Sequence, residues 1–256
     1  MKIISVANQK GGVGKTTTTM ALGAALATKG KRVLLIDLDP QGNLSNYLGF
    51  EPDSGSTIHE LIVAGATGRE LDAASCIRHS EAEQLDYIPA TLALSGADAV
   101  IQSAIGRESV LHRVLQAPLF SNYDYILIDC LPSLGNLTLN AFGASDSVLV
   151  PVQMQKFALD GLDALFNSIK MIQQLINPKL TLGGILQTMR DNTNMSESVK
   201  DYLITNYGDA VYNTSIRRSV EAANSTAYQK SLVSYNNKLG LEYKAFADEF
   251  LARERD

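Results

Sequence analysis

The sequence predicts an α/β fold in which a mostly parallel, twisted sheet is flanked by helices on both faces. Residues 2–8 and 31–37 are short apolar runs typical of buried strands, and the helix-competent segment 17–29 connects them. A strand, a helix and a second strand with short connections form a βαβ unit, whose two strands are parallel. Further apolar runs at 123–129 and 147–152 extend the same sheet.

The remaining elements follow from apolar periodicity, capping residues and glycine stops. We expect strands at 2–8, 31–37, 85–90, 123–129, 147–152 and 180–188. We expect one helix at 17–29 that stops at Gly30, helices starting at 56 and at 92, a helix at 137–142, an amphipathic helix ending at Ile176 and a closing helix at 241–251. A chain of 256 residues with 45% hydrophobic content buries one large core. We therefore expect a single domain over 1–256, without an N-terminal helix-turn-helix domain.

The loop after the first strand carries the strongest chemical signal. A β-branched apolar strand ends in a glycine-rich turn and a helix begins at once, which is the context of a phosphate cradle. Glycines let backbone N–H groups approach a ligand closely, and the helix directs its positive N-terminal end at the same point. The predicted ATP-binding residues are Lys10, Gly11, Gly12, Val13, Gly14, Lys15, Thr16 and Thr17. The pattern predicts a P-loop NTPase fold with Lys15 on the phosphates and the Thr16 hydroxyl on Mg²⁺.

Three aspartates close the neighbouring strands. Asp37 and Asp39 end the strand 31–37, and Asp129 ends the strand 123–129 in a Walker B pattern. Ligands of open α/β sheets bind outside the carboxyl ends of the strands, so these carboxylates should face the phosphate loop. The period of two places Asp37 and Asp39 on one side and Leu38 on the other. The patterns predict that Thr16 and Asp129 hold Mg²⁺.

The loop sequence Lys-Gly-Gly-Val-Gly-Lys-Thr-Thr, residues 10–17, resembles the deviant Walker A motif of the ParA/MinD family of P-loop ATPases. Segment 37–43 is similar to the switch I of that family, and 151–162 to its partitioning branch. The resemblance implies that Lys10 reaches the partner's phosphates in an ATP-bound homodimer. It also implies that Asp37 joins Thr16 and Asp129 in holding Mg²⁺ with its water shell, and that Asp39 orients or activates the attacking water. Lys10, Lys15 and Asp39 are thus the implied catalytic residues. In switch II, Leu131 stands where the family usually has a proline.

The resemblance extends to adenine and DNA contacts. It places Met189, Arg217 and Ser219 near the base, although the last two differ from the usual residues of their loop. It implies non-specific, phosphate-directed DNA binding, for which the candidates are Arg190, Arg217, Arg218 and Lys230. The family usually has a further arginine where this chain has Glu221.

The resemblance to the ParA/Soj type implies an ATP hydrolase that drives plasmid or chromosome partitioning. The expected partners are DNA and a ParB-like, centromere-binding protein that stimulates hydrolysis. The expected location is cytoplasmic, on the nucleoid when ATP is bound. Two alternatives remain: a MinD-like or orphan positioning ATPase acting on a membrane or a protein scaffold, and a metabolic synthetase that uses ATP to activate a substrate. The acidic residues of the closing helix argue against a membrane.

Composition restricts the function further. The net charge of −5 argues against a general nucleic-acid coat but leaves room for a local basic patch. Cys76 and Cys130 match no metal spacing and suit a reducing cytosol. The N-terminus has no signal pattern, and no apolar run reaches the length of a membrane span. We assign no chemistry to residues 44–105, where His59 and His79 share no ligand spacing with other side chains.

Overall fold

The structure is a computed structural model that describes all residues except 53–54, 156–158, 160, 236 and 255–256. The strands are β1 Lys2–Val6, β2 Val33–Leu38, β3 Arg78–Ser80, β4 Leu85–Ile88, β5 Tyr125–Cys130, β6 Ser147–Gln153, β7 Thr181–Arg190 and β8 Val211–Arg217. The helices are α1 Lys15–Thr28, α2 Asn43–Tyr47, α3 Ile58–Thr67, α4 Ala97–Gln102, α5 Val110–Leu115, α6 Asn136–Ala144, α7 Leu162–Leu175, α8 Asn194–Tyr207, α9 Glu221–Ala227 and α10 Lys238–Arg253.

The described strands form one eight-stranded sheet in the order β3-β4-β2-β5-β1-β6-β7-β8. Every pairing is parallel except that of β3 with β4, which is antiparallel. The P-loop NTPase-like α/β fold expected from the sequence is therefore confirmed. Because the strands run in the same direction, their carboxyl ends meet at one edge of the sheet, where ligands of such folds bind.

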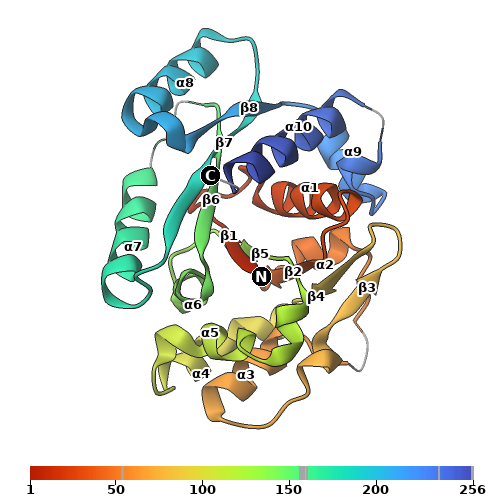
Figure 1. The fold of residues 1–256 in the computed structure, drawn as a ribbon, viewed down its shortest axis with the longest axis vertical. Helices are drawn as coiled ribbons and strands as arrows, with labels where there is room; N and C mark the ends of the chain where they lie inside the picture. Colours follow the sequence, from red (N-terminus) through yellow and green to blue (C-terminus); the bar gives the residue numbers. More distant parts are fainter. Residues whose placement is uncertain (53–54, 156–158, 160, 236, 255–256) are drawn as a thin grey trace.

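Two apolar cores cover the two faces of the sheet (Figure 1). Helices α1 and α10 pack together on one face, with Met20 and Phe246 fully buried between them and the strands. Helices α3 to α7 cover the other face, where Ile62 and Phe142 are fully buried. Alternate strand residues divide between the cores: Ile4 belongs to the first and Ile3 to the second. The closing helix packs on the core, as its aromatic spacing predicts.

Local signals placed most of the elements correctly. The helix start at 56–62 is a capping box, in which Thr57 accepts from the N–H of His59 and Glu60 accepts from the N–H of Thr57. The segment 92–101, expected to form one helix, is a 3₁₀ turn over Leu92–Gly96 followed by α4. None of the helices in the described part of the chain is long and apolar enough to cross a membrane.

Six of the described strands and helices were not predicted: β3, β8, α2, α5, α8 and α9. The edge strand β8 alternates poorly because Asn213, Thr214 and Ser215 interrupt its apolar residues. Of the fourteen residues of α8, only Ser196, Val199 and Leu203 are buried, so its amphipathic pattern is weak. Part of the family-like segment 151–162 lies outside the described residues, at 156–158 and 160.

Candidate functional site

The phosphate loop and two acidic side chains meet at the carboxyl edge of the sheet. In the parallel register Asp129 of β5 lies opposite Val6 of β1 on one side and opposite Asp37 of β2 on the other. The loop 7–14 leaves β1 at this level and leads into α1. Adjacent strands lie about 4.8 Å apart, so the two carboxylates are neighbours beside the loop.

The backbone of the loop has the shape that a phosphate ligand requires. Gly12 has φ 72° and Gly14 has φ 89°, a left-handed region in which a side chain is strained. The space in which a Cβ would lie at Gly11 and Gly12 is open, and both residues are exposed. Helix α1 begins at the next residue, Lys15, so its N-terminal amides face the same open space.

Two residues that the sequence analysis did not single out hold this loop in place. Asn8 donates its amide to the carbonyl of Pro151 at 2.8 Å and accepts the N–H of Lys10 at 3.0 Å. Thr188, at the end of β7, donates its hydroxyl to the carbonyl of Val13 at 2.8 Å. The loop is thereby connected to β6 and β7. The place of Asn8, directly after the first strand, was the only signal in the sequence.

Lys15 is buried, and its ammonium is directed into the loop. Its side chain is 8% exposed, and Nζ donates to the carbonyl of Lys10 at 3.2 Å. Burial lowers the pKa of this ammonium, while the charges of Asp129 and Asp39 act in the opposite direction. A buried cation with one hydrogen bond to a carbonyl is under-satisfied, and a phosphate oxygen would complete its coordination.

The carboxylates of Asp37 and Asp129 are both 1% exposed. Burial raises the pKa of both carboxyls above the usual value, and for Asp129 the charge of Asp37 adds to the effect. Thr16 hydrogen-bonds to Asp129, yet Oδ1 of Asp129 has no hydrogen-bond partner among the described residues. Two buried carboxylates beside a hydroxyl, one of them with an unsatisfied oxygen, are oxygen ligands of the kind that a hard divalent cation prefers.

These residues fit Mg²⁺ held together with a nucleotide. Within the described part of the chain no three histidine, cysteine, aspartate or glutamate side chains form a metal cluster. Mg²⁺ does not require such a cluster, because it keeps several waters and binds through one or two carboxylates and the substrate's phosphates. Thr16, Asp37 and Asp129 offer one hydroxyl and two carboxylates of this kind, and their role as metal ligands stays a prediction.

Asp39 follows β2 at the rim of the site. Its N–H donates to Oδ1 of Asp37 at 3.2 Å, and its own Oδ1 accepts the N–H of Gln41 at 2.9 Å. Leu38, between the two aspartates, is fully buried in the core. The side chain of Leu38 therefore lies on the opposite side from those of the two aspartates, as the period of two predicts. Asp37 is buried and Asp39 is half-buried beside the loop.

A family model described as an AAA domain matches residues 1–182. The sporulation initiation inhibitor protein Soj of Bacillus subtilis is 45% identical over 237 residues, which cover 92% of this chain and 91% of that protein. The chromosome partitioning protein ParA of Caulobacter vibrioides is 40% identical over 261 residues and covers 100% of this chain and 96% of its own.

The chain belongs to the Soj/ParA family of partitioning ATPases. A solved structure from Mycobacterium smegmatis, named cobyrinic acid a,c-diamide synthase, matches with a TM-score of 0.86 and 36% identity, covering 100% of this chain and 96% of that one. That protein was solved with ADP and magnesium and with an ATP analogue and magnesium. Homologous sites therefore hold the ligands that the loop and carboxylates of this Soj/ParA-family chain fit.

The candidate adenine residues lie at the ends of β7 and β8. Met189 has φ 52°, an unusual backbone conformation for a residue with a side chain, directly after the Thr188 that holds the loop. Arg217 is held by Glu242 of α10, which accepts from its backbone N–H at 2.8 Å and from its Nε at 2.6 Å. Ser219 accepts the N–H of Glu221 at 3.2 Å. These contacts orient the loop after β8 toward the carboxyl edge.

Three of the four candidate DNA residues gather at one place. Arg190 and Arg217 are register partners on β7 and β8, and the N–H of Arg218 donates to the carbonyl of Arg190 at 2.9 Å. Nε of Arg190 is buried and has no partner among the described residues. Lys230 lies elsewhere, beyond α9, with its ammonium 5.5 Å from the ring centroid of Tyr235.

The switch II strand ends in a buried thiol. Cys130 is 1% exposed, and burial raises its pKa to about 12, so the thiol stays protonated and packs as a small core residue. This confirms the structural interpretation of Cys130. After it, the backbone turns sharply, with the N–H of Ser133 donating to the carbonyl of Leu131 at 2.9 Å.

Proposed function

We propose that this chain is an ATP-driven partitioning switch: ATP closes a homodimer that binds DNA without sequence preference, and a ParB-like partner stimulates the hydrolysis that releases it. The observation that carries the proposal is the buried pair Asp37 and Asp129 beside a phosphate loop that contains two lysines. The whole chain, 1–256, acts as one ATPase unit, in the cytoplasm and on the nucleoid when ATP is bound. Relatives named Soj and ParA support this function.

Each residue of the site has a defined task in the proposal. The amides of the loop and the ammonium of Lys15 bind and orient the phosphates, while Thr16, Asp37 and Asp129 hold the metal and its water shell. Mg²⁺, when bound, supplies positive charge to the phosphate oxygens where negative charge develops. Asp39, half-buried at the rim, orients the attacking water and accepts its proton.

Lys10 supplies the second cation across the dimer. Its backbone N–H is fixed by Asn8, and the structure describes no ion pair of its side chain. A cation inserted from the partner stabilises the charge of the transferring phosphoryl group, in the manner of an arginine finger. Hydrolysis thus requires two copies of the chain, and loss of the γ-phosphate removes a contact that holds them together.

The proposed DNA surface is the cluster of Arg190, Arg217 and Arg218 at the ends of β7 and β8. The cluster lies beside the candidate adenine loop, and in the proposal a closed dimer brings two such clusters to one composite surface. Glu242 neutralises part of Arg217, which leaves Arg218 as the stronger phosphate contact. Contacts of this kind depend steeply on salt.

The proposal is tested by binding to non-specific duplex DNA with ATP, with ADP and without nucleotide, at roughly 50 and 200 mM salt. We expect binding only with ATP, weakened at the higher salt, and lost in Arg218→Ala but not in Lys179→Ala, an exposed lysine before β7. Equal binding with ATP and ADP would contradict the switch. ATP-dependent dimers that bind no DNA would favour a positioning ATPase on a scaffold or a membrane.

A second candidate, an ATP-using synthetase, is favoured by the name of the Mycobacterium smegmatis structure. It requires a small acidic substrate whose carboxylate is activated by the nucleotide. Its discriminating result is ATP turnover that depends on a small molecule and does not respond to DNA. DNA-stimulated turnover without any added small molecule would exclude it.

A further inference from the structure

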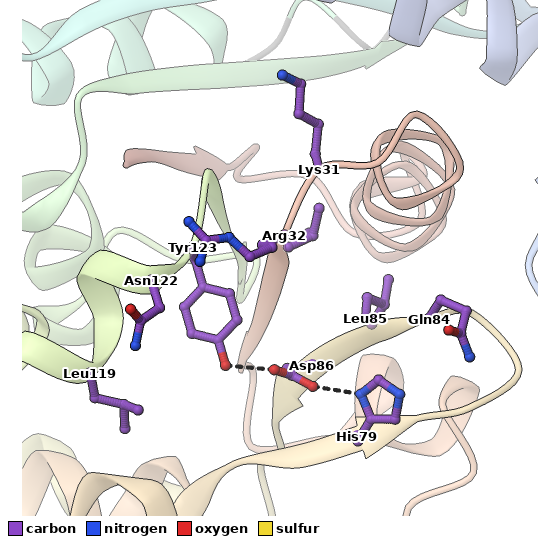
Figure 2. Close-up of a pocket in the computed structure, with 10 residues that line it drawn as sticks. Lys31, Arg32, His79, Gln84, Leu85, Asp86, Leu119, Asn122 and Tyr123 are labelled. Atoms are coloured by element: carbon purple, nitrogen blue, oxygen red, sulfur yellow. Dashed lines mark hydrogen bonds and ion pairs between the residues drawn. The ribbon is translucent and has the colours of Figure 1, made fainter.

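A cavity lies at the amino ends of the strands, which is the end of the sheet opposite to the candidate nucleotide site. It has a volume of about 380 Å³ and is lined by Arg32, Asp86 and Tyr123, which lie at the amino ends of β2, β4 and β5 (Figure 2). We call it the basal cavity. Arg32 stands five positions before Asp37, so about 16 Å of extended chain lies between the basal cavity and the candidate metal site.

The carboxylate of Asp86 contacts two other side chains that line the basal cavity. Oδ2 of Asp86 accepts the hydroxyl of Tyr123 at 2.7 Å, and Oδ1 lies 2.7 Å from Nδ1 of His79 (Figure 2). Each carboxylate oxygen therefore already has a partner. With Asp86 as the acceptor, Nδ1 of His79 is the protonated nitrogen, and in the neutral ring the other nitrogen, Nε2, is an acceptor.

Two consecutive cations line the same cavity. Lys31 and Arg32 have no ion-pair partner within the described part of the chain, although the chain carries a net charge of −5. The side chain of Lys31 extends away from the pair of Asp86 and His79 (Figure 2). The amide of Asn122 adds a further donor to the lining. Two further acids lie nearby. Oδ2 of Asp124 accepts the backbone N–H of Arg32 at 2.8 Å, and Glu81, with its side chain 89% exposed to solvent, lies 3.9 Å from Nε2 of His79.

We propose that the basal cavity binds a small dianion, a phosphoryl or dicarboxylate group held by Lys31 and Arg32, with the ring of His79 on the same cavity wall as a reporter. The hydrogen bonds of Asp86 join the β3–β4 hairpin to β5. If the cluster around Asp86 were purely structural, these bonds would be its whole role. That role leaves two adjacent cations unpaired on the wall of a cavity. Because Asp86 is engaged with Tyr123 and His79, the ammonium of Lys31 and the guanidinium of Arg32 remain as donors, and an anion satisfies them.

The test uses the wild-type chain saturated with Mg²⁺ and ADP, so that the phosphate loop is filled. Inorganic phosphate and succinate are titrated separately at constant ionic strength, and the imidazole resonances of His79 are followed by NMR. The chain has three histidines, and His79→Gln assigns the signal. We expect a saturable shift of the His79 resonances with at least one probe. The probe that binds more tightly identifies the group as phosphoryl or dicarboxylate.

The decisive comparison is between two double variants. Lys31→Gln/Arg32→Gln removes the two cations of the basal cavity, and the control Arg69→Gln/Lys179→Gln removes two exposed cations elsewhere. We expect the apparent Kd to rise about tenfold or more in the first pair and to stay within about twofold in the second. An unshifted His79 signal with both probes, or the same Kd in both double variants, would overturn the proposal. Thermal unfolding of each variant verifies the fold, and neither result depends on DNA binding or hydrolysis.

Discussion

Ser45 donates two hydrogen bonds to one oxygen of Asp37. Its N–H lies 2.8 Å and its hydroxyl 2.7 Å from Oδ2 of that carboxylate. The same hydroxyl accepts the N–H of Ala90 at 2.9 Å, beyond the end of β4. Ser45 therefore fixes the orientation of a candidate metal ligand and connects the ends of two strands, although it stands in no recognised motif.

We expect Ser45→Ala to weaken both stability and turnover. The N–H of Ala90 loses its buried acceptor, which should lower the free energy of unfolding by about 1–3 kcal/mol. The loss of an outer hydrogen bond to a metal ligand should reduce Mg²⁺-dependent ATP turnover by about 10–100-fold. Ser198→Ala, at an exposed serine of α8, is the matched control for chemical denaturation and ATPase assays. Unchanged turnover in Ser45→Ala would show that Asp37 needs no such support.

Substitution of the two loop lysines should separate binding from hydrolysis. We expect Lys15→Gln to abolish nucleotide binding, because it removes the buried phosphate cation. Lys10→Gln should keep the nucleotide affinity of the monomer within a few-fold while losing at least about 100-fold in dimer-dependent turnover. Titration of a fluorescent ATP analogue and an ATPase assay measure the two effects. Normal ATP affinity in Lys15→Gln would refute the loop assignment.

Asp39→Ala should stop the chemistry without disturbing the dimer. The side chain lies at the rim and its only described hydrogen bond is to the N–H of Gln41, so its removal leaves the phosphate loop and the metal pair intact. We expect ATP-dependent dimers by light scattering, with turnover reduced by about 100-fold or more. The control Glu51→Ala removes an exposed acid elsewhere. Wild-type hydrolysis in Asp39→Ala would remove this residue from the mechanism.

Glu249 should make the free energy of unfolding of the protein fall as the pH is lowered into the acid range. Burial raises the pKa of this carboxyl, but the hydrogen bonds from the N–H groups of Asn213 and Thr214 and from Arg253 outweigh it, so the net pKa lies below the usual value. A lowered folded-state pKa contributes stability that is present above the unfolded value and lost as the pH falls through the folded one.

The corresponding measurement compares wild type with Glu249→Gln. We expect the variant to be less stable by about 1–3 kcal/mol near neutral pH, since charge-assisted hydrogen bonds are lost, and the difference to shrink as the pH falls below about 4. Denaturation curves at several pH values follow the difference, with Asp201→Asn on α8 as an exposed control. A constant difference across the whole range would show that the ionised form carries no advantage.

The phosphate loop and the closing aspartates were predictable because each depends on local sequence. A β-branched strand, a glycine turn and a helix start follow one another without a gap, and Asp37 and Asp129 directly end their strands. The supports of the site were not predictable in this way. Asn8, Ser45 and Thr188 support it through a few hydrogen bonds from separate parts of the chain, and a lone polar residue carries no periodic signal.

The sequence by itself determined the parallel α/β architecture, the nucleotide loop and the acids beside it, because short connections and strand periodicity act over neighbouring residues. Only the tertiary structure decided that Arg190, Arg217 and Arg218 form one cluster while Lys230 stands apart, and that Asp86 brings His79 and Tyr123 to one cavity. These arrangements depend on which strands pair and in what register. That pairing is set by burial of the two faces of the sheet, to which residues far apart in the chain contribute together.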